Sequence, residues 1–489
     1  MERGGPTSYN PEPDPLCDPC RMHPNTLFLG HIRYIVTNGR ATDRISIDQS
    51  LSAVPSSVAE DSDTDGDHTG CLRSSAFSNT AASHIFDCFR FELRLAFRNM
   101  SHIASKPKVL ILDGGLGTTL EDVFHQDISH ALWSAKPIEE DPEVIIAAHL
   151  AFLRAGANII LTSTYQCAYN TFERAGYSRE DAKRIMLKSV ALANEARRRY
   201  LEEWRQEAKH GDRLSSPPPP PEVKIALSLG PYGGTLSPSH EFDGVYPPPY
   251  GPNLSSSEKR SNAFEDTDED RAEEQASIDA LATFHYERLR IFVDDTETWG
   301  TIDYVAFETV PLRREVYAIR KAVSQLLEEQ ESETPGWQMK AWWISNDYPD
   351  GSFPETKASG DHYTPTEVAD AVLVDDIGAT AWGIGINCTG AEFMKGLTKE
   401  ARSAAKGYAK KHGRRPWLLL YPNRGDVYNP ETQTWCKMGR EGSQWAKDLC
   451  AVVLENMQSG DWEGVIAGGC CKVGPEEIVG LAKELHAWL

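Results

Sequence analysis

The sequence predicts an α/β protein of the (β/α)8 class, the TIM barrel, and three observations support this fold. Eight short runs rich in Val, Ile and Leu follow one another from residue 109 onward. Segments with helical periodicity separate these runs, and strands that are apolar almost throughout require helices on both faces of a parallel sheet. A doubly wound open sheet is the competing fold, but the first strand is followed by DGGLGTTL, which lacks the third glycine of a dinucleotide-binding turn.

The predicted strands are VLILDGG (109–115), NIILTSTY (158–165), VKIALSLG (223–230), YVAFETV (304–310), MKAWWIS (339–345), WGIGINC (382–388), WLLLYPN (417–423) and GVIAGGC (464–470). Predicted helices between and after them include 141–156, 178–204, 364–376, 391–413, 443–457 and 474–489. Several of these segments begin with Asp, Ser or Thr near a proline and end at glycine, as helix caps require.

Composition divides the chain into two parts. Residues 1–105 carry scattered Ser, Asp, Gly and Pro and an acidic run at 60–67, which predicts a long, mostly disordered N-terminal extension. Residues 106–489 form the predicted barrel domain, and Met100 just before it raises the hypothesis of a shorter product that starts there. Proline-rich and acidic insertions at 217–221, about 244–272 and 347–362 predict surface loops, as does the acidic stretch 265–274.

Charge and hydropathy exclude several classes of function. Asp and Glu outnumber Lys and Arg by 72 to 50, a net charge of −22, and no basic patch is present to bind nucleic acid. The longest apolar stretch, 145–161, is interrupted by His149 and Arg154, so we expect no membrane span. The first residues do not resemble a secretion or transit signal, and ten cysteines are too few for a disulfide scaffold, which together predict a cytoplasmic location.

Polar residues end most of the predicted strands, where a barrel of this type places its active site. Cys388 ends strand six, and Cys470 and Cys471 end strand eight, so closure of the barrel brings three sulfur atoms to one rim. Thiolates are ligands that zinc prefers, and three protein ligands leave a fourth position for water or substrate. The alternative is that these cysteines are small apolar side chains that fill the barrel. The other candidates at strand ends are Asp113, Thr164, Gln166, Tyr232, Glu308, Ser345, Asn346, Asn387, Tyr421 and Asn423.

Seven short motifs in this order resemble the homocysteine S-methyltransferase family. They are DGGLGT (113–118), TSTYQ (162–166), GPYG (230–233), AFET (306–309), GINC (385–388), YPNRGDVY (421–428) and GGCC (468–471). The resemblance implies a zinc ion held by Cys388, Cys470 and Cys471, with the sulfur of homocysteine as fourth ligand. YPNRGDVY with a following Trp435 is most similar to the branch that uses a sulfonium methyl donor, S-methylmethionine or S-adenosylmethionine.

The same resemblance implies contacts for the amino-acid part of homocysteine. Glu308 matches the family position for the ammonium group, and Asp113 is a second acidic contact, although a carboxylate at a strand end can also cap the next helix. The glycine pairs 114–115 and 468–469 offer backbone N–H groups to the carboxylate of homocysteine, or else permit tight turns. Gly114, Asn387, Tyr421 and Asn423 are further candidates, and Thr164 and Gln166 are equally well explained as hydrogen-bonding groups of the rim.

These observations predict zinc-dependent methyl transfer from a sulfonium donor to homocysteine, giving methionine. Zinc suits this reaction, because only the thiolate of homocysteine is a good nucleophile and a metal ion removes its proton. Three alternatives remain open: a selenocysteine methyltransferase, a non-catalytic zinc- or thiol-binding barrel that acts as a sensor or scaffold, and a phosphate-handling aldolase or isomerase barrel. Arg424 departs from the family motif and would repel a sulfonium donor unless Asp426 or another acid pairs with it.

Overall fold

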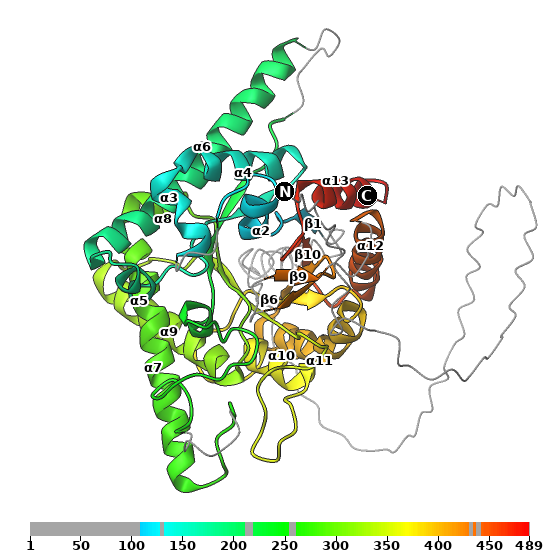
Figure 1. Ribbon diagram of the computed structural model, residues 1–489. Helices are drawn as coiled ribbons and strands as arrows, with labels where there is room; N and C mark the ends of the chain where they lie inside the picture. The colour runs from blue at the N-terminus through cyan, green and yellow to red at the C-terminus, as the bar shows by residue number, and fades with distance from the viewer. Residues whose placement is uncertain are drawn as a thin grey trace, which may run out of the picture. The chain divides into compact units, whose positions relative to one another are not determined.

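The computed structural model describes residues 108–127, 132–210, 219–253, 261–429, 434–436 and 442–488 (Figure 1). The expectations for residues 1–105 and for a start at Met100 lie outside these residues. Within them, eight parallel strands form one sheet in the order β1-β10-β7-β6-β5-β4-β3-β2. A parallel bridge between Leu112 and Ile159 joins the two edges, and the Asp113 N–H donates to the Ile159 carbonyl at 3.0 Å. The sheet is therefore closed into a barrel, and the predicted (β/α)8 fold is confirmed.

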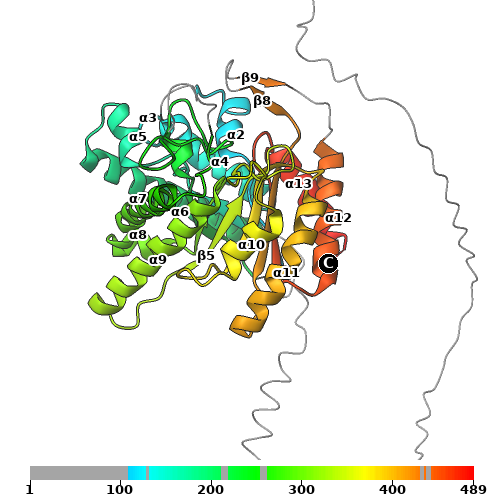
Figure 2. The same cartoon turned by 90° about the horizontal axis from the view of Figure 1, so that it is seen from below.

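The eight barrel strands match the eight predicted runs in number and order. They are β1 (Lys108–Ile111), β2 (Ile159–Leu161), β3 (Lys224–Leu229), β4 (Tyr304–Phe307), β5 (Ala341–Asn346), β6 (Gly383–Gly390), β7 (Trp417–Asn423) and β10 (Gly464–Ala467). A short antiparallel hairpin of β8 (Val427–Asn429) and β9 (Thr434–Cys436) follows β7 and lies at one end of the barrel (Figure 2).

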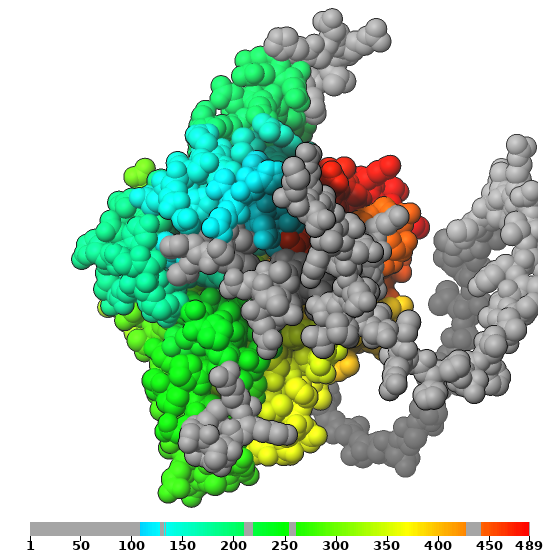
Figure 3. Space-filling view, viewed as in Figure 1, coloured from blue at the N-terminus to red at the C-terminus, as the bar shows by residue number. Residues whose placement is uncertain are grey.

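Helices surround the barrel, and their colours follow one another around the view in chain order (Figures 1 and 3). The α-helices are α2 (Leu116–Asp122), α3 (Pro137–Glu140), α4 (Pro142–Arg154), α5 (Tyr169–Arg174), α6 (Arg179–His210), α7 (Asp268–Val293), α8 (Thr296–Thr301), α9 (Arg313–Glu333), α10 (Pro365–Leu373), α11 (Met394–His412), α12 (Gly442–Ser459) and α13 (Pro475–His486). Two 3-10 turns are η1 (Trp133–Ala135) and η2 (Tyr232–Thr235). None of the helices in the described part of the chain has the length and apolar character needed to cross a membrane.

Strand alternation separates the inside of the barrel from its helix-covered outside. In β7, Trp417, Leu419 and Tyr421 belong to the inner cluster, whereas Leu418 and Leu420 pack in the outer core beneath the helices. Side chains alternate between the two faces of a strand, so a residue two positions beyond an inner residue also faces the barrel axis. By this rule, polar residues that continue the alternation beyond the inner apolar layer also face the barrel axis.

One expectation for the insertions is wrong. The acidic stretch 265–274 is not wholly a loop, because α7 begins at Asp268. Thr267 caps this helix by accepting a hydrogen bond from the Asp270 N–H, and Asp268, Glu269 and Asp270 occupy its first turn. Negative charges there interact favourably with the helix dipole, so the acidic run favours the start of a helix.

Candidate metal centre and substrate site

Three cysteine sulfur atoms converge at the carboxyl ends of β6 and β10. The Sγ atoms of Cys388 and Cys470 are 2.7 Å apart, and those of Cys388, Cys470 and Cys471 all lie within 4.8 Å of one another. All three cysteines are free thiols, with Cys388 buried and the other two partly buried. In the described residues this is the one group of three or more His, Cys, Asp or Glu side chains whose ligand atoms converge so closely. The donor set suits a thiophilic ion such as zinc.

Unusual backbone conformations direct these sulfur atoms to one point. Cys388 has a φ of 49° and Lys472, directly after Cys471, a φ of 61°, both in the left-handed region that residues other than glycine seldom adopt. The register between β6 and β7 shifts after Asn387, as at a β-bulge. As a result both Asn387 and Cys388 contact Cys470, although successive residues of a regular strand face opposite sides. Such strain concentrates at functional sites.

Polar side chains support the three sulfur atoms. The Thr309 hydroxyl donates to the Cys388 Sγ at 3.7 Å, and the Asn387 amide donates to the Cys470 Sγ at 3.9 Å. Asn387 also donates to the Thr309 Oγ1 at 2.7 Å and accepts from the Thr309 N–H at 2.9 Å. Beside them, the Cys471 N–H donates to the Asn423 Oδ1 at 3.1 Å. Hydrogen bonds of this kind orient metal ligands and hold their charge.

The three thiols differ in acidity. Hydrogen bonds from Cys388 and Cys470 hold the pKa of Cys471 well below its usual range. The pKa of Cys388 is raised, first by its contacts with Cys470 and Cys471 and then by burial. The lowered pKa of Cys471 favours its thiolate form, which would attract a cation to the cluster.

Buried carboxyl groups line the same end of the barrel. Glu308 follows β4, is 4% exposed, and accepts a hydrogen bond from the Ser228 hydroxyl of β3. Burial raises the pKa of Glu308 to about 8, because a charged carboxylate is poorly solvated there. Asp113 follows β1 and is fully buried. Its Oδ2 accepts from the Leu161 N–H at 2.8 Å, while its Oδ1 has no partner among the described residues. Burial and the nearby charge of Glu308 raise the pKa of Asp113 well above its usual range.

The comparisons with known proteins agree with this geometry. Residues 110–485 match the family model "Homocysteine S-methyltransferase", which covers most of the chain. Homocysteine S-methyltransferase 4 of Zea mays is 31% identical over 378 residues, 77% of this chain and 89% of the relative. The chain belongs to the homocysteine S-methyltransferase family. It is an enzyme of this class and transfers a methyl group to homocysteine.

A further curated relative and a solved structure are also similar to this chain. Selenocysteine Se-methyltransferase of Brassica oleracea var. italica is 29% identical over 375 residues, 77% of this chain and 88% of the relative. The oxidised form of the homocysteine methyltransferase MmuM from Escherichia coli has a similar fold, with a TM-score of 0.50 and 24% identity. The structural match covers 77% of this chain and 95% of MmuM.

Several residues expected in the methyltransferase site have other partners in the structure. Thr164 donates to the Ser228 carbonyl at 2.7 Å, as the rim alternative predicts. A Cβ added at Gly114 would lie 2.2 Å from the Val473 carbonyl oxygen, so close packing requires this glycine. The N–H groups of Gly468 and Gly469 donate to the carbonyls of Leu420 and Asp113, which favours the turn alternative for this pair.

The remaining candidates keep a place at the site. The Tyr421 hydroxyl donates to the Ser345 Oγ at 2.7 Å, directly below the rim. The Gln166 Oε1 is buried and has no partner among the described residues, so it is free to accept a hydrogen bond from a ligand. Glu308 caps no helix, because α9 begins only at Arg313. The substrate roles of these residues stay predictions.

Sequence reasoning missed two acidic residues of this rim. Glu241 lies in the segment after β3 and accepts a hydrogen bond from the Tyr165 hydroxyl at 2.6 Å. Asp347 follows β5 directly and is fully buried. Both lie in or beside segments whose composition indicates surface loops. The alternation of side chains along the strand could have indicated Asp347, because it lies two positions after Ser345 and four after Trp343.

Arg424 is neutralised by neighbouring acids. Its guanidinium donates to Asp426 and lies 3.4 Å from the Glu477 carboxylate. These acids raise the pKa of Arg424, although burial opposes them. The condition that a sulfonium donor requires at this position is therefore met.

Proposed function

We propose that this methyltransferase holds a zinc ion through Cys388, Cys470 and Cys471 and takes its methyl group from a sulfonium compound. The observation that supports the metal site is the convergence of three sulfur atoms from two distant strands within 4.8 Å. Three thiolates suit zinc and leave a further position open, which is typical of catalytic rather than structural zinc sites. Zinc, when bound, supplies the positive charge that favours the thiolate form of a nearby thiol.

The residues of the chain have defined tasks in this proposal. Asn387 and Thr309 donate hydrogen bonds to the cysteine sulfurs and thereby fix their positions. Glu308 and Asp113 receive the ammonium group of homocysteine, and the cation stabilises the charged forms of these buried carboxyl groups. The two contacts orient the thiol of homocysteine toward the cysteine cluster, so that its sulfur, the methyl carbon and the donor sulfur align.

The transfer itself needs no strong acid. The thiol of homocysteine loses its proton to water, and its sulfur forms a bond to the methyl carbon. The bond between that carbon and the donor sulfur breaks, and its electron pair stays on the donor. The donor leaves as a neutral thioether, so no group has to protonate it. The site therefore accelerates the methyl transfer by positioning the substrates and by electrostatic stabilisation.

Metal analysis and a donor panel test this proposal. Zinc-loaded protein is incubated with homocysteine and, separately, S-methylmethionine, S-adenosylmethionine, betaine or a methylated folate, and methionine is quantified. We expect one zinc ion per chain and product from a sulfonium donor. Zinc without product from any donor would favour the sensor or scaffold alternative, and product from betaine or the folate alone would contradict the sulfonium assignment. Selenocysteine as acceptor, compared with homocysteine, tests the alternative suggested by the Brassica relative.

A further inference from the structure

Asp347 is a buried charge site that the proposed reaction does not yet use. Its side chain is 0% exposed, and both carboxylate oxygens lack a hydrogen-bond partner among the described residues. Buried polar groups in native proteins are almost always hydrogen-bonded, and an unpaired carboxylate is among the most costly to bury. An orphaned pair of oxygens at an active-site rim therefore indicates a partner that arrives with a ligand.

Strand geometry directs this carboxyl group into the barrel. Trp343 belongs to the inner cluster, and two residues later the Ser345 hydroxyl bonds to Tyr421, which is also an inner residue. Asp347 is the next residue in this alternation, so its side chain faces the barrel axis above Ser345. Asn346 pairs with Ile386 across the sheet, which sets Asp347 beside the strand end that carries Cys388.

Glu241 is a second carboxylate near the cysteine cluster, close enough for its charge to act on both Asp347 and Cys471. One of its oxygens accepts from the Tyr165 hydroxyl, and the segment that carries it is anchored by buried Glu315. Glu315 accepts from the Tyr232 N–H and from the Tyr246 hydroxyl, each at 2.7 Å. The segment that includes Glu241 is therefore held to α9 on both sides of this residue, at Tyr232 and at Tyr246.

The two carboxyl groups influence each other and the sulfur atoms. After burial, the charge of Glu241 is among the causes that raise the pKa of Asp347, and the charge of Cys470 acts on both groups. Glu241 likewise acts on Cys471. In the described part of the chain, no lysine, arginine or histidine forms an ion pair with either carboxylate. The described residues therefore supply no counter-charge to these two carboxyl groups, and a cation that binds beside them would favour their charged forms.

We propose that Glu241 and Asp347 form the cation-binding part of the donor site and hold the sulfonium centre of the methyl donor beside the cysteine cluster. This assignment rests on the proposed function, because it takes a sulfonium compound as the second substrate. A sulfonium centre offers no hydrogen bond, so a protein can recognise it only through charge and contact. Homocysteine carries a single cation, its ammonium group, for which Asp113 and Glu308 are already available.

Glu241 and Asp347 also bind the methyl donor more strongly than the demethylated product. Transfer of the methyl group converts the sulfonium into a neutral thioether, so the attraction to Glu241 and Asp347 disappears at that step. The same two charges bind the ground state of the donor at least as well as the transition state, in which the positive charge is already reduced. They therefore lower the KM for the donor and do not raise kcat.

Binding measurements on the full-length, zinc-loaded chain test this assignment. Titration calorimetry compares S-methylmethionine with methionine, which has the same ammonium and carboxylate groups but a neutral sulfur. We expect Asp347→Asn and Glu241→Gln each to reduce the preference for S-methylmethionine about tenfold. The donor KM should rise by a similar factor, while kcat and the affinity for homocysteine stay unchanged. Asp376→Asn is the control, because its side chain is 100% exposed and pairs with Lys411.

The outcomes distinguish this assignment from the proposed function. An unchanged preference in both folded variants would overturn the donor site, as would a loss of homocysteine affinity in place of sulfonium affinity. A wild-type protein that prefers S-methylmethionine, loses this preference in the variants, yet forms no methionine would support the cation site and overturn the proposed function. Circular dichroism and unchanged zinc content in each variant exclude misfolding as the cause of a lost preference.

Discussion

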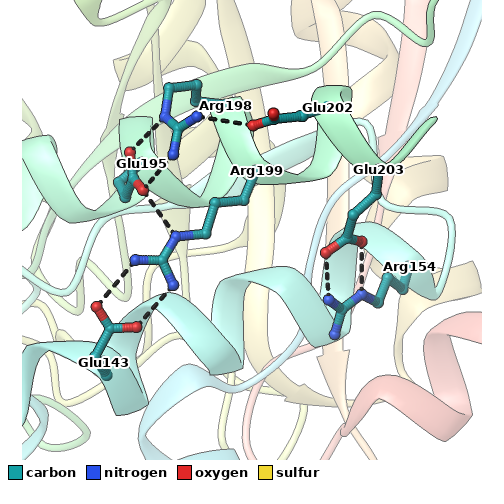
Figure 4. Close-up of polar contacts among 7 residues, drawn as sticks. All are labelled: Glu143, Arg154, Glu195, Arg198, Arg199, Glu202 and Glu203. Atoms are coloured by element: carbon teal, nitrogen blue, oxygen red, sulfur yellow. Dashed lines mark hydrogen bonds and ion pairs between the residues drawn. The ribbon is translucent and has the colours of Figure 1, made fainter. Parts of the chain in front are cut away.

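Two regions of the molecule differ in whether their carboxyl groups have cationic partners. One region is the outer face of α4 and α6, and the other is the rim of the barrel. On the outer face, each of the carboxylates shown in Figure 4 pairs with at least one arginine. Hydrogen bonds from Arg198 and Arg199 lower the pKa of Glu195 to about 2. The ion pairs there are Arg198 with Glu195 and Glu202, Arg199 with Glu195 and Glu143, and Arg154 with Glu203.

At the rim, the buried carboxyl groups form no ion pair with a Lys, Arg or His residue in the part of the chain that the structure describes. Burial raises the pKa of Glu308 to about 8 and that of Glu241 to about 7. Asp113 and Asp347 shift in the same direction, also chiefly through burial. The 50 Lys and Arg residues of the chain are too numerous for this to reflect a shortage of cations.

The difference teaches where the missing charge comes from. On the surface the protein supplies its own counter-charge. At the rim, the proposed function brings the counter-charge with the ligands, namely a metal ion, an ammonium group and a sulfonium centre. Unpaired buried carboxyl groups lower stability, so their presence together at one site is consistent with selection for binding.

The sharpest test of this contrast removes one sulfur atom from the rim. In Cys470→Ser we expect zinc content to fall to a small fraction of one ion per chain, because a hydroxyl is a poor replacement for a thiolate. Turnover should fall about 100-fold or more, since even partners of metal ligands cost 10–100-fold when they are lost. Plasma emission spectrometry and a methionine assay measure the two effects.

Cys450→Ser is the matched control. Cys450 is a buried free thiol of α12, away from the cluster, and its loss should leave zinc content and turnover unchanged. Equal losses in the two variants would show that general damage to the fold, and not the ligand set, explains the result.

The fold of this site could be predicted largely from sequence. Parallel strands that are buried on both faces appear as continuous apolar runs, and all eight were recognised in order. Because the carboxyl ends of these strands meet at one rim, Cys388 was expected near Cys470 and Cys471, and the structure brings them together. The start of α7 was missed because acidic residues are typical both of loops and of the first turn of a helix.

The pairing of the rim carboxyl groups could not be predicted. Whether Asp347 has a partner depends on which side chains face it from neighbouring strands, and sequence periodicity does not give those contacts. The segment that carries Glu241 is anchored to α9 by a hydrogen bond from the Tyr232 N–H to Glu315, two residues that lie 83 positions apart in the sequence. Such long-range contacts are visible only in three dimensions.

A smaller effect is expected when one rim carboxyl group is neutralised. Glu308→Gln keeps the size of the side chain and its contact with Ser228 but removes the charge that an ammonium group requires. We expect the KM for homocysteine to rise about tenfold, while the KM for the donor stays unchanged. Steady-state kinetics with each substrate varied in turn measure both values, and an unchanged homocysteine KM would contradict the assignment.

The same substitution should change how stability depends on pH. The pKa of Glu308 rises from 4.5 to about 8 on folding, so the folded state binds an extra proton between these values. The contribution of Glu308 to stability is therefore most favourable below about pH 4.5 and falls as the pH rises toward 8, by about 1.4 kcal/mol per pH unit at most for one proton. Relative to wild type, Glu308→Gln should gain stability from pH 5 to pH 8, measured by urea unfolding. A stability difference that stays constant with pH would show that Glu308 is ionised in the folded protein.

The outer face should show the opposite sign and the smallest effect. The pKa of Glu195 falls from 4.5 to about 2 on folding, so its contribution is present above pH 4.5 and is lost as the pH falls toward 2. Glu195→Gln should therefore be less stable than wild type at pH 7, by less than about 1 kcal/mol because the pairs are exposed. Urea unfolding at pH 7 and pH 3 should show this gap closing in acid, with turnover at pH 7 unchanged. A loss of turnover would break the comparison, because it would couple the surface charges to the rim.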